Sequence, residues 1–224
     1  MEPRVVRGLR EATGRNSAGA EPYIPTTKSL RRLSAAVQDC RGCDLYRGAT
    51  QAVFGRGPRD AGLMLVGEQP GHAEDLEGAP FVGPAGELLD RALERAGIDR
   101  AAVYVTNVVK HFKYVREGKR RIHKTPNQGE IEACRPWLFR EIALVDPSVL
   151  VCLGATAARA MLGPGFRLLK ERGRFVPSTL SPRILATIHP SAVLRARDDE
   201  RTRMFGLLAA DLSVAFAGLE TVRR

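Results

Sequence analysis

Residues 63–71 read LMLVGEQPG, and this stretch decides the fold. Its first four residues are apolar, and this run is long enough for one short buried strand. Gly67 begins a polar loop directly after it. Three further short apolar runs have the same design, at residues 103–109, 149–153 and 184–188. Because these runs are largely apolar, they are typical of a parallel sheet that is covered on both faces.

Helical patterns separate the four expected strands. Apolar residues at helical spacing lie in 88–96, 131–142 and 204–215, and Gly97 would end the first of these helices. Pro136 lies inside the second pattern, where we expect it to kink or restart the helix. Strands that alternate with helices predict an α/β fold, here a three-layer αβα sandwich around a mostly four-stranded parallel sheet.

The length and composition fit one globular domain. The chain has 224 residues, of which 44% are hydrophobic, and this allows a single large α/β domain. Residues 1–27 are rich in Arg, Gly, Ala and Ser, so we expect a flexible tail there and one domain over 28–224, with Thr27 as a candidate helix cap. No apolar run approaches the ~20 residues of a membrane span, and residues 1–14 lack a signal-peptide core. We therefore expect a cytoplasmic monomer without a membrane anchor.

The charge of the chain points to a polyanionic partner. The formal net charge is +10, from 35 Lys and Arg against 25 Asp and Glu. Residues 110–124, KHFKYVREGKRRIHK, contain seven Lys or Arg with Glu117 as the one carboxylate, and aromatic side chains lie between the cations. A solvated basic loop has a similar composition. Its position beside the ends of the expected strands favours contact with a phosphate backbone, and DNA is the expected partner.

The cysteines form a second chemical signal: Cys40, Cys43, Cys134 and Cys152. A C-x2-C pair followed by two distant cysteines is typical of metal ligation, and disulfides are a poor expectation in a reducing compartment. A zinc ribbon would repeat the short C-x2-C spacing, and four thiolates from distant segments suit a [4Fe–4S] cluster about as well as zinc. Cys152 lies in an apolar run and could instead be an ordinary buried side chain. The spacing favours a metal site and leaves the metal open.

Polar residues follow three of the expected strands. Glu68 comes after the first strand, Asn107 lies in the second, and His189 follows the fourth. Each has an ordinary explanation on its own, as a helix cap, a turn residue or a buried histidine. Ligands bind at the carboxyl ends of parallel strands, so together these residues predict a catalytic cluster at one edge of the sheet.

Several ordered motifs resemble those of the family 4 uracil-DNA glycosylases. They are GEQPG at 67–71, PFVGPAG at 80–86, Thr106-Asn107, and HPS at 189–191. The resemblance extends from about residue 40 to residue 212 and implies a [4Fe–4S] cluster on the four cysteines. Two features depart from the usual family pattern: Gln69 stands where alanine is usual, and GKRRIH at 118–123 is an insertion. Both resemble the UdgX subgroup, whose members end covalently attached to DNA.

The resemblance implies a role for each site residue. The implied uracil-binding residues are Gln69, Gly71, Phe81 and Asn107. Asn107 would read the hydrogen-bonding edge of uracil, and Phe81 would stack on its face. Glu68 would lie near C1′ of the sugar, and His189 beside the uracil oxygen where negative charge grows. The expected DNA contacts are Lys110, Lys119, Arg120, Arg121, Ser191 and Arg195.

His123 is the implied nucleophile. A neutral imidazole nitrogen near C1′ could capture the oxocarbenium-like sugar before water does, while Glu68 holds the other ring nitrogen. Without the resemblance, His123 is one more polar residue of a phosphate-binding loop. Two alternatives stay open. One is a conventional multiple-turnover uracil-DNA glycosylase that uses water, and the other is a non-catalytic iron–sulfur protein that binds DNA or senses redox state.

Overall fold

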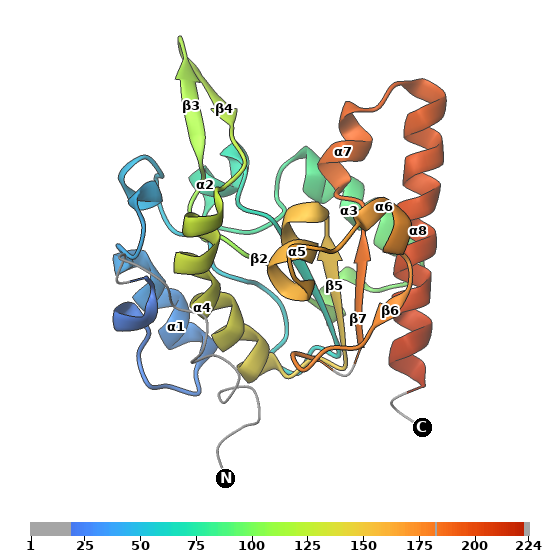
Figure 1. The fold of residues 1–224 in the computed structure, drawn as a ribbon, viewed down its shortest axis with the longest axis horizontal. Coiled ribbons are helices and arrows are strands. Elements are labelled where there is room, and N and C mark those ends of the chain that lie inside the picture. Colours follow the sequence, from blue (N-terminus) through green and yellow to red (C-terminus); the bar gives the residue numbers. More distant parts are fainter. Residues whose placement is uncertain (1–18, 182, 222–224) are drawn as a thin grey trace.

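The expected strands form one sheet in the computed structural model, which describes residues 19–181 and 183–221 (Figure 1). The four parallel strands are β1 (Leu63–Gly67), β2 (Val103–Asn107), β5 (Val149–Leu153) and β7 (Arg183–Thr187). A short fifth strand, β6 (Phe175–Val176), pairs with β7 in the antiparallel direction, and the order is β2-β1-β5-β7-β6. The parallel sheet predicted from the sequence is confirmed. A strand of two residues is too short to produce a periodic pattern, which is why β6 was not expected.

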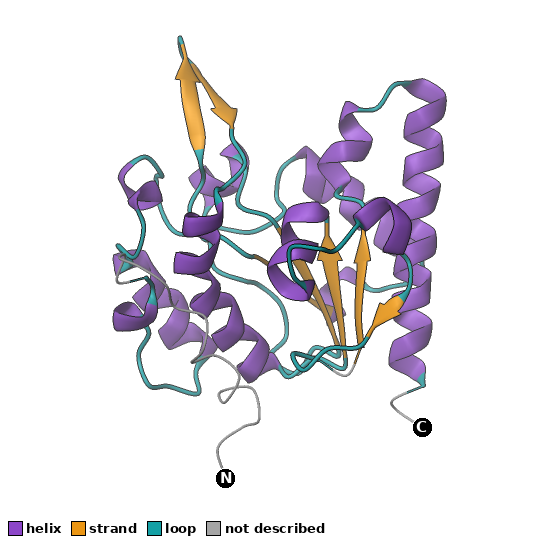
Figure 2. Ribbon diagram, in the orientation of Figure 1, coloured by secondary structure: helices purple, strands orange, loops and turns teal. Residues whose placement is uncertain are grey.

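Helices cover both faces of the sheet (Figure 2). One face packs against α4 (Gln128–Val145) and α5 (Ala155–Leu162), and α1 (Leu30–Ala36) belongs to the same core. The other face packs against α3 (Pro84–Arg95), α7 (Pro190–Arg195) and α8 (Asp198–Glu220). Successive residues of β5 belong to opposite cores, with Leu150 on the first face and Val151 on the second, because side chains alternate along a strand. The predicted three-layer αβα sandwich is confirmed.

Two helices differ from expectation. α4 continues through Pro136 from Gln128 to Val145, so the predicted restart at this proline is wrong. The buried Trp137 and Leu138 come directly after the proline and anchor this part of the helix in the core. α8 is longer than expected, and its length and apolar composition would allow it to cross a membrane. Its buried residues pack on the sheet instead, as in the core helix of a globular domain.

The N-terminal part of the described chain lies against α4. Residues 1–18 of the expected tail lie outside the described residues. The backbone N–H of Ala20 donates to the carbonyl of Ala133 at 2.8 Å, and Arg140 donates to the carbonyl of Thr27 at 2.9 Å. Ser29, rather than Thr27, caps α1 by accepting from the N–H of Arg32 at 3.3 Å. Residues 19–27 therefore contact the domain.

The basic stretch 110–124 contains a β-hairpin rather than a loop. Its strands are β3 (Tyr114–Glu117) and β4 (Arg120–His123), and the hairpin projects away from the sheet (Figure 1). Gly118 lies in the turn with φ +59°, a conformation that glycine adopts without strain. The register pairs Tyr114 with His123. His123 therefore lies at the base of the hairpin, next to the carboxyl edge of the sheet.

Candidate active site

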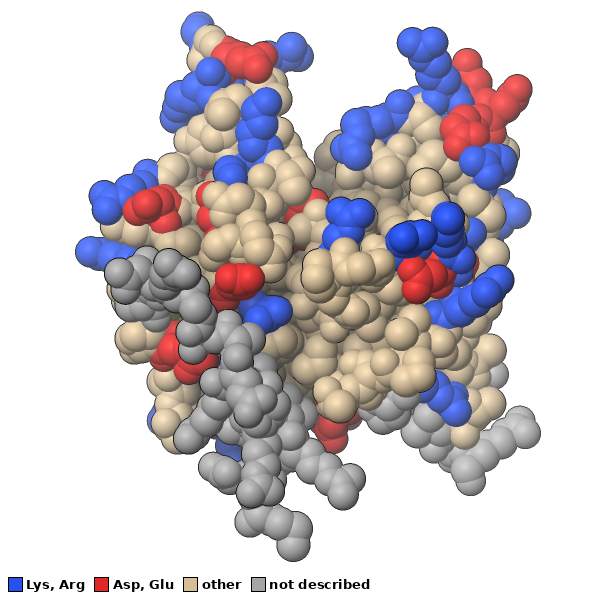
Figure 3. All heavy atoms as spheres, in the orientation of Figure 1, with Lys and Arg blue, Asp and Glu red and all other residues tan. Residues whose placement is uncertain are grey.

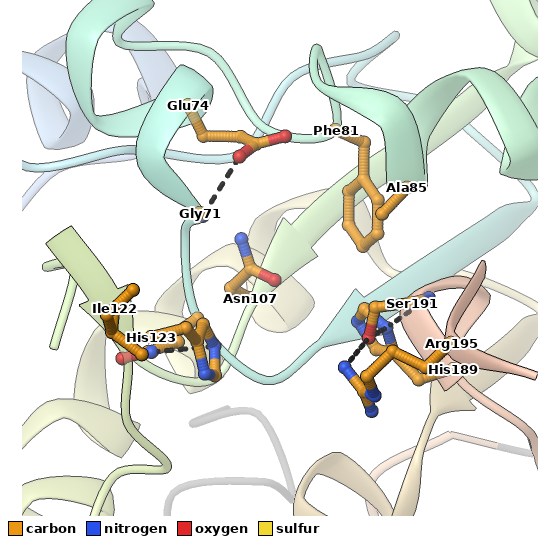
Figure 4. A pocket seen from close by; sticks show the side chains of 11 residues that line it. Gly71, Glu74, Phe81, Ala85, Asn107, Ile122, His123, His189, Ser191 and Arg195 are labelled. Carbon is orange, nitrogen blue, oxygen red and sulfur yellow. Dashed lines mark hydrogen bonds between the residues drawn. The ribbon is translucent and has the colours of Figure 1, made fainter. Parts of the chain in front are cut away.

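A cavity of about 400 Å³ opens at the carboxyl ends of β1, β2 and β7 (Figure 4). It is lined by Gln69, Gly71, Glu74, Phe81, Ala85, Asn107, Ile122, His123, His189, Ser191 and Arg195. The structure thus brings the implied uracil-binding residues together with two of the three implied catalytic residues. The third, Glu68, lines a neighbouring cavity of about 450 Å³.

Asn107 places an amide in the cavity (Figure 4). It ends β2, and its Oδ1 is buried with no hydrogen-bond partner among the described residues. A Cβ on Gly67, the paired residue of β1, would lie 2.3 Å from this oxygen and 2.7 Å from the Phe81 ring. Because only glycine leaves this space, Gly67 allows the amide and the ring to lie side by side. The free oxygen can accept a hydrogen bond from a ligand.

Phe81 forms a wall of the same cavity. Its ring stacks on that of His189, with 6.1 Å between centroids and 29° between planes. Its backbone φ is +56°, which is unusual for a bulky residue, and such strain clusters at functional sites. The side chain is buried. Phe81 can therefore present a rigid apolar face to a planar ligand.

Glu74 joins the two loops that surround the cavity, and sequence reasoning missed it. It belongs to α2 (His72–Glu77). Its carboxylate accepts from the backbone N–H of Gly71 at 2.9 Å, of Val82 at 3.1 Å and of Gly83 at 2.9 Å. An acidic residue in the first turn of a helix is the available signal, because it forms half of a capping box with Gly71. Its contacts with residues 82 and 83 leave no pattern in the sequence.

The contacts of His189 determine which of its two ring nitrogens carries the hydrogen. Its Nδ1 accepts from the backbone N–H of Ser191 at 3.1 Å and lies 2.8 Å from the Ser191 hydroxyl. Burial, together with the nearby Arg195 and His123, lowers the pKa of His189 to about 4. The imidazole is therefore neutral near pH 7, with its hydrogen on Nε2. This N–H can donate to an oxygen on which negative charge grows.

His123 is half exposed, and its Nε2 lies at the centre of a polar group. The Nε2 atom is 2.8 Å from the amide nitrogen of Gln69 and 3.6 Å from Oε1 of Glu68. Because the Gln69 amide is a donor, Nε2 carries the lone pair and Nδ1 the hydrogen. Burial lowers the pKa of His123, Arg195 lowers it too, and Glu68 opposes them. The near contact of Glu68 is with Nε2, the same ring nitrogen that faces Gln69.

Gln69 fixes the base of the hairpin. The two hydrogens of its amide nitrogen are shared among His123 Nε2 and the carbonyls of Lys113 at 3.2 Å and Lys124 at 3.0 Å, and its Oε1 accepts from the N–H of Lys113 at 2.9 Å. These two lysines adjoin the ends of β3 and β4. An alanine at position 69 would make none of these bonds. The unusual glutamine and the insertion therefore act together in the structure.

Glu68 turns a carboxylate toward His123. Its Oε2 accepts from the hydroxyl of Thr156 at 2.5 Å, whereas its Oε1 is buried and lacks a hydrogen-bond partner among the described residues. A carboxylate with a free oxygen can stabilise a cation that forms beside it. The site thus combines an unpaired amide oxygen, a neutral histidine donor, an imidazole lone pair and a carboxylate.

Comparisons with known proteins identify the family. The family model described as the uracil DNA glycosylase superfamily matches residues 54–213. The chain belongs to this superfamily. The type-4 uracil-DNA glycosylase of Pyrobaculum aerophilum is 36% identical over 196 residues, which are 84% of this chain and 94% of that protein. The type-4 uracil-DNA glycosylase of Thermotoga maritima is 38% identical over 77% of this chain and 86% of that protein. The crystal structure of wild-type Pedobacter heparinus SMUG2 has a similar fold, with a TM-score of 0.50 at 13% identity over 97% of each chain.

Two of the expected DNA contacts of this superfamily member are wrong. Lys110 is fully buried, where its ammonium binds Glu141 and donates to Thr106 Oγ1 and the Asn107 carbonyl, both at 2.7 Å. Arg121 binds Asp75 at 2.6 Å, and its side chain is only 10% exposed. Both cations therefore hold the domain together: Lys110 lies beneath Asn107, and Arg121 anchors the hairpin to α2.

The remaining expected contacts lie around a hollow. Lys119 and Arg120 are exposed on the hairpin, and Arg195 is exposed on α7. Ser191 contributes its hydroxyl to His189 instead of leaving it free. Figure 3 shows Lys and Arg on two projections, the hairpin and the end of the molecule formed by α7 and α8, with a hollow between them. A polyanionic strand could lie in this hollow.

Three of the four cysteines lie close together. Burial raises the pKa of Cys134, and the nearby Cys43 and Cys40 raise it further. Two N–H groups donate to sulfur: that of Lys110 to Cys134 at 3.2 Å, and the Trp137 indole to Cys40 at 3.2 Å. Sulfur ligands of iron–sulfur clusters accept such bonds. Burial alone raises the pKa of Cys152 on β5. Between residues 19 and 221, residue 182 apart, no group of three or more His, Cys, Asp or Glu side chains is arranged to hold a metal ion. The donor chemistry fits a cluster for three thiols, whereas Cys152 lies apart.

Proposed function

We propose that this protein excises uracil from DNA. The free Oδ1 of Asn107 in the cavity carries the proposal. Uracil presents an N–H donor beside a carbonyl acceptor, and an asparagine amide supplies the complementary acceptor and donor. Cytosine has no hydrogen at the corresponding ring nitrogen, so it would leave Oδ1 unpaired. The names of the relatives from Pyrobaculum aerophilum and Thermotoga maritima support the same activity.

The chemistry begins with a base outside the stack, because the cavity cannot be reached by a paired base. When the bond between N1 and C1′ breaks, its electron pair leaves with uracil and the sugar becomes an oxocarbenium-like cation. The Nε2–H of His189 donates to the uracil oxygen that gains charge, and Phe81 stacks on the ring. The carboxylate of Glu68 stabilises the cation at C1′.

We further propose that His123 captures this cation, the reaction of the UdgX subgroup. The lone pair of Nε2 forms the bond to C1′, the hydrogen on Nδ1 leaves to solvent as the ring regains neutrality, and uracil takes a proton from water. The neutral state of His123 and its position 3.6 Å from Glu68 support this step. Gln69 must release Nε2 before attack. The product is stable because a neutral imidazole is a poor leaving group.

Conventional multiple turnover is the second candidate. In that reaction, Glu68 would orient a water that attacks C1′, and the abasic strand would dissociate. The names of the type-4 relatives fit this reaction equally well. The substrate in either case is uracil-containing DNA, single- or double-stranded, and we expect the enzyme to act as a cytoplasmic monomer.

We propose that Cys40, Cys43 and Cys134 hold a [4Fe–4S] cluster, whereas Cys152, the fourth ligand implied by the resemblance, lies apart as a buried side chain of β5. The proximity of Cys40, Cys43 and Cys134, and the N–H groups that donate to Cys134 and Cys40, support this proposal. The cluster would supply a covalent connection between α4 and the segment before β1. None of the proposed steps transfers an electron, so its role would be structural.

Incubation with a uracil-containing oligonucleotide, followed by a denaturing gel, separates these candidates. We expect a shifted protein–DNA band from the wild type. His123→Ala should give no shifted band, and His123→Ser should admit water and release abasic DNA. Free abasic DNA from the wild type would establish the conventional reaction. Untouched DNA would contradict uracil excision.

A further inference from the structure

The second cavity, about 450 Å³ in volume, continues the first one. The two cavities share a wall formed by Gln69, His123, His189, Ser191 and Arg195. Glu68 lines the second cavity. In the proposed reaction, C1′ of the uridine must lie beside Glu68 and His123. The DNA strand that carries uracil in the first cavity therefore continues across this wall.

The far side of the second cavity is apolar. It is formed by Leu153, Leu168, Leu169, Ile188 and Met204, with small residues of α5. Leu169, on α6 (Leu168–Glu171), is 83% exposed and is the most exposed large apolar side chain between residues 19 and 221, residue 182 apart. The preceding residue, Leu168, packs against both cores and holds α6 in place. Leu169 is thus held at the cavity while making little contact with the protein.

The charges around this apolar side suit a nucleotide. Arg167 and Lys170 flank Leu168 and Leu169, are exposed, and have no carboxylate partner within the described part of the chain. Arg195 is exposed on the shared wall. Apolar surface bordered by cations is what a nucleobase and its phosphate require. A volume of about 450 Å³ lies within the usual range of ligand sites.

We propose that the second cavity is a subsite for the nucleobase next to the uridine on the same strand. Leu169 and Met204 contact the face of this base, and Arg167 and Lys170 lie near its phosphates. The proposal rests on uracil excision and adds a contact beyond the uracil pocket. Apolar contact with a base face is tolerant of sequence because every base has such a face. The subsite therefore favours strands with a base at this position over strands without one.

The test uses single-stranded oligonucleotides that carry uracil and either normal neighbours, an abasic spacer on its 5′ side, or one on its 3′ side. Uracil release in a single turnover is followed as enzyme concentration varies. For the wild type, we expect one of the spacers to raise the half-saturating concentration by about tenfold, at the lower end of what stacking of one base on an aromatic side chain contributes. Leu169→Ala should show a similar loss with normal DNA and no further loss with that spacer. Leu169→Met should restore the wild-type pattern.

The matched control is Leu76→Ala, because Leu76 is also an exposed leucine, at 54%, and lines neither cavity. It should behave as the wild type on all three strands. Equal weakening of all strands by Leu169→Ala, or no weakening at all, would overturn the subsite. If the wild type releases uracil and neither spacer matters, the subsite alone is wrong. If no strand loses uracil, the proposed function itself fails.

Discussion

Replacing Glu74 tests how the loops around the cavity are held. Its carboxylate accepts three backbone N–H groups from two loops, those of Gly71, Val82 and Gly83. Glu74→Gln turns one of its two acceptor oxygens into a donor, so at least one N–H group faces an NH2 group. Glu74→Ala removes the acceptor for all three. The matched control is Glu77→Gln, because Glu77 is an exposed carboxylate on the same helix.

The expected cost follows from the number of bonds. A hydrogen bond to a charged group contributes about 1.5–3 kcal/mol, so Glu74→Gln should lower the free energy of unfolding by about 2 kcal/mol. Glu74→Ala leaves three donors without an acceptor, one of them buried, and should cost about 4 kcal/mol, a large effect for one substitution. The loop that carries Phe81 should also shift. Such a displacement lowers kcat/KM by about ten- to a hundredfold.

Urea unfolding and the kinetics of uracil release measure the two effects separately. We expect unfolding free energies in the order wild type, Glu74→Gln, Glu74→Ala, with Glu77→Gln equal to the wild type. Uracil release should weaken in the same order. If Glu74→Ala unfolds at the same urea concentration as the wild type and releases uracil as fast, Glu74 does not organise these loops.

Further predictions concern recognition of the base, the pH dependence of stability and the iron content of the protein. Asn107→Ala should lower kcat/KM for uracil release by at least about a hundredfold, because the site loses its match to the uracil edge; unchanged release would mean that another residue reads the base. Burial lowers the pKa of His189 from 6.5 to about 4, so between these two pH values the unfolded chain binds a proton that the native protein excludes. The free energy of unfolding should therefore fall as the pH drops from 6.5 to about 4. His189→Asn should reduce this fall in urea unfolding curves, and an identical pH profile would refute the cause. The isolated protein should be brown, with about four irons per chain, and Cys43→Ser should lose them; full activity of colourless zinc-loaded protein would contradict the cluster.

Short-range patterns predicted the sheet and its active edge. The strands at 63–67 and 149–153 were predictable because burial on both faces demands continuous apolar runs. The position of the cavity followed from topology, since parallel strands bring Asn107 and His189 to the same edge. The hairpin was missed because charged residues occupy both faces of its strands and hide any alternation.

Long-range pairing explains the errors in the charged residues. Lys110 was grouped with the DNA-contacting cations, yet its partner Glu141 lies on α4, far along the chain. Arg121 similarly finds Asp75 on α2. A lysine or arginine in a basic stretch does not reveal in which direction it points. Glu74 escaped notice for a related reason, because its partners are backbone groups that any residue carries.

The most direct test of the account is a mass measurement on the protein after incubation with a uracil-containing oligonucleotide. We predict that the intact mass increases by that of the strand without its uracil, and that fragmentation of the digested protein places the attachment on His123. Unmodified protein beside free abasic DNA would contradict the covalent step. An adduct on His189, His111 or a lysine would contradict the assignment of His123 as the nucleophile.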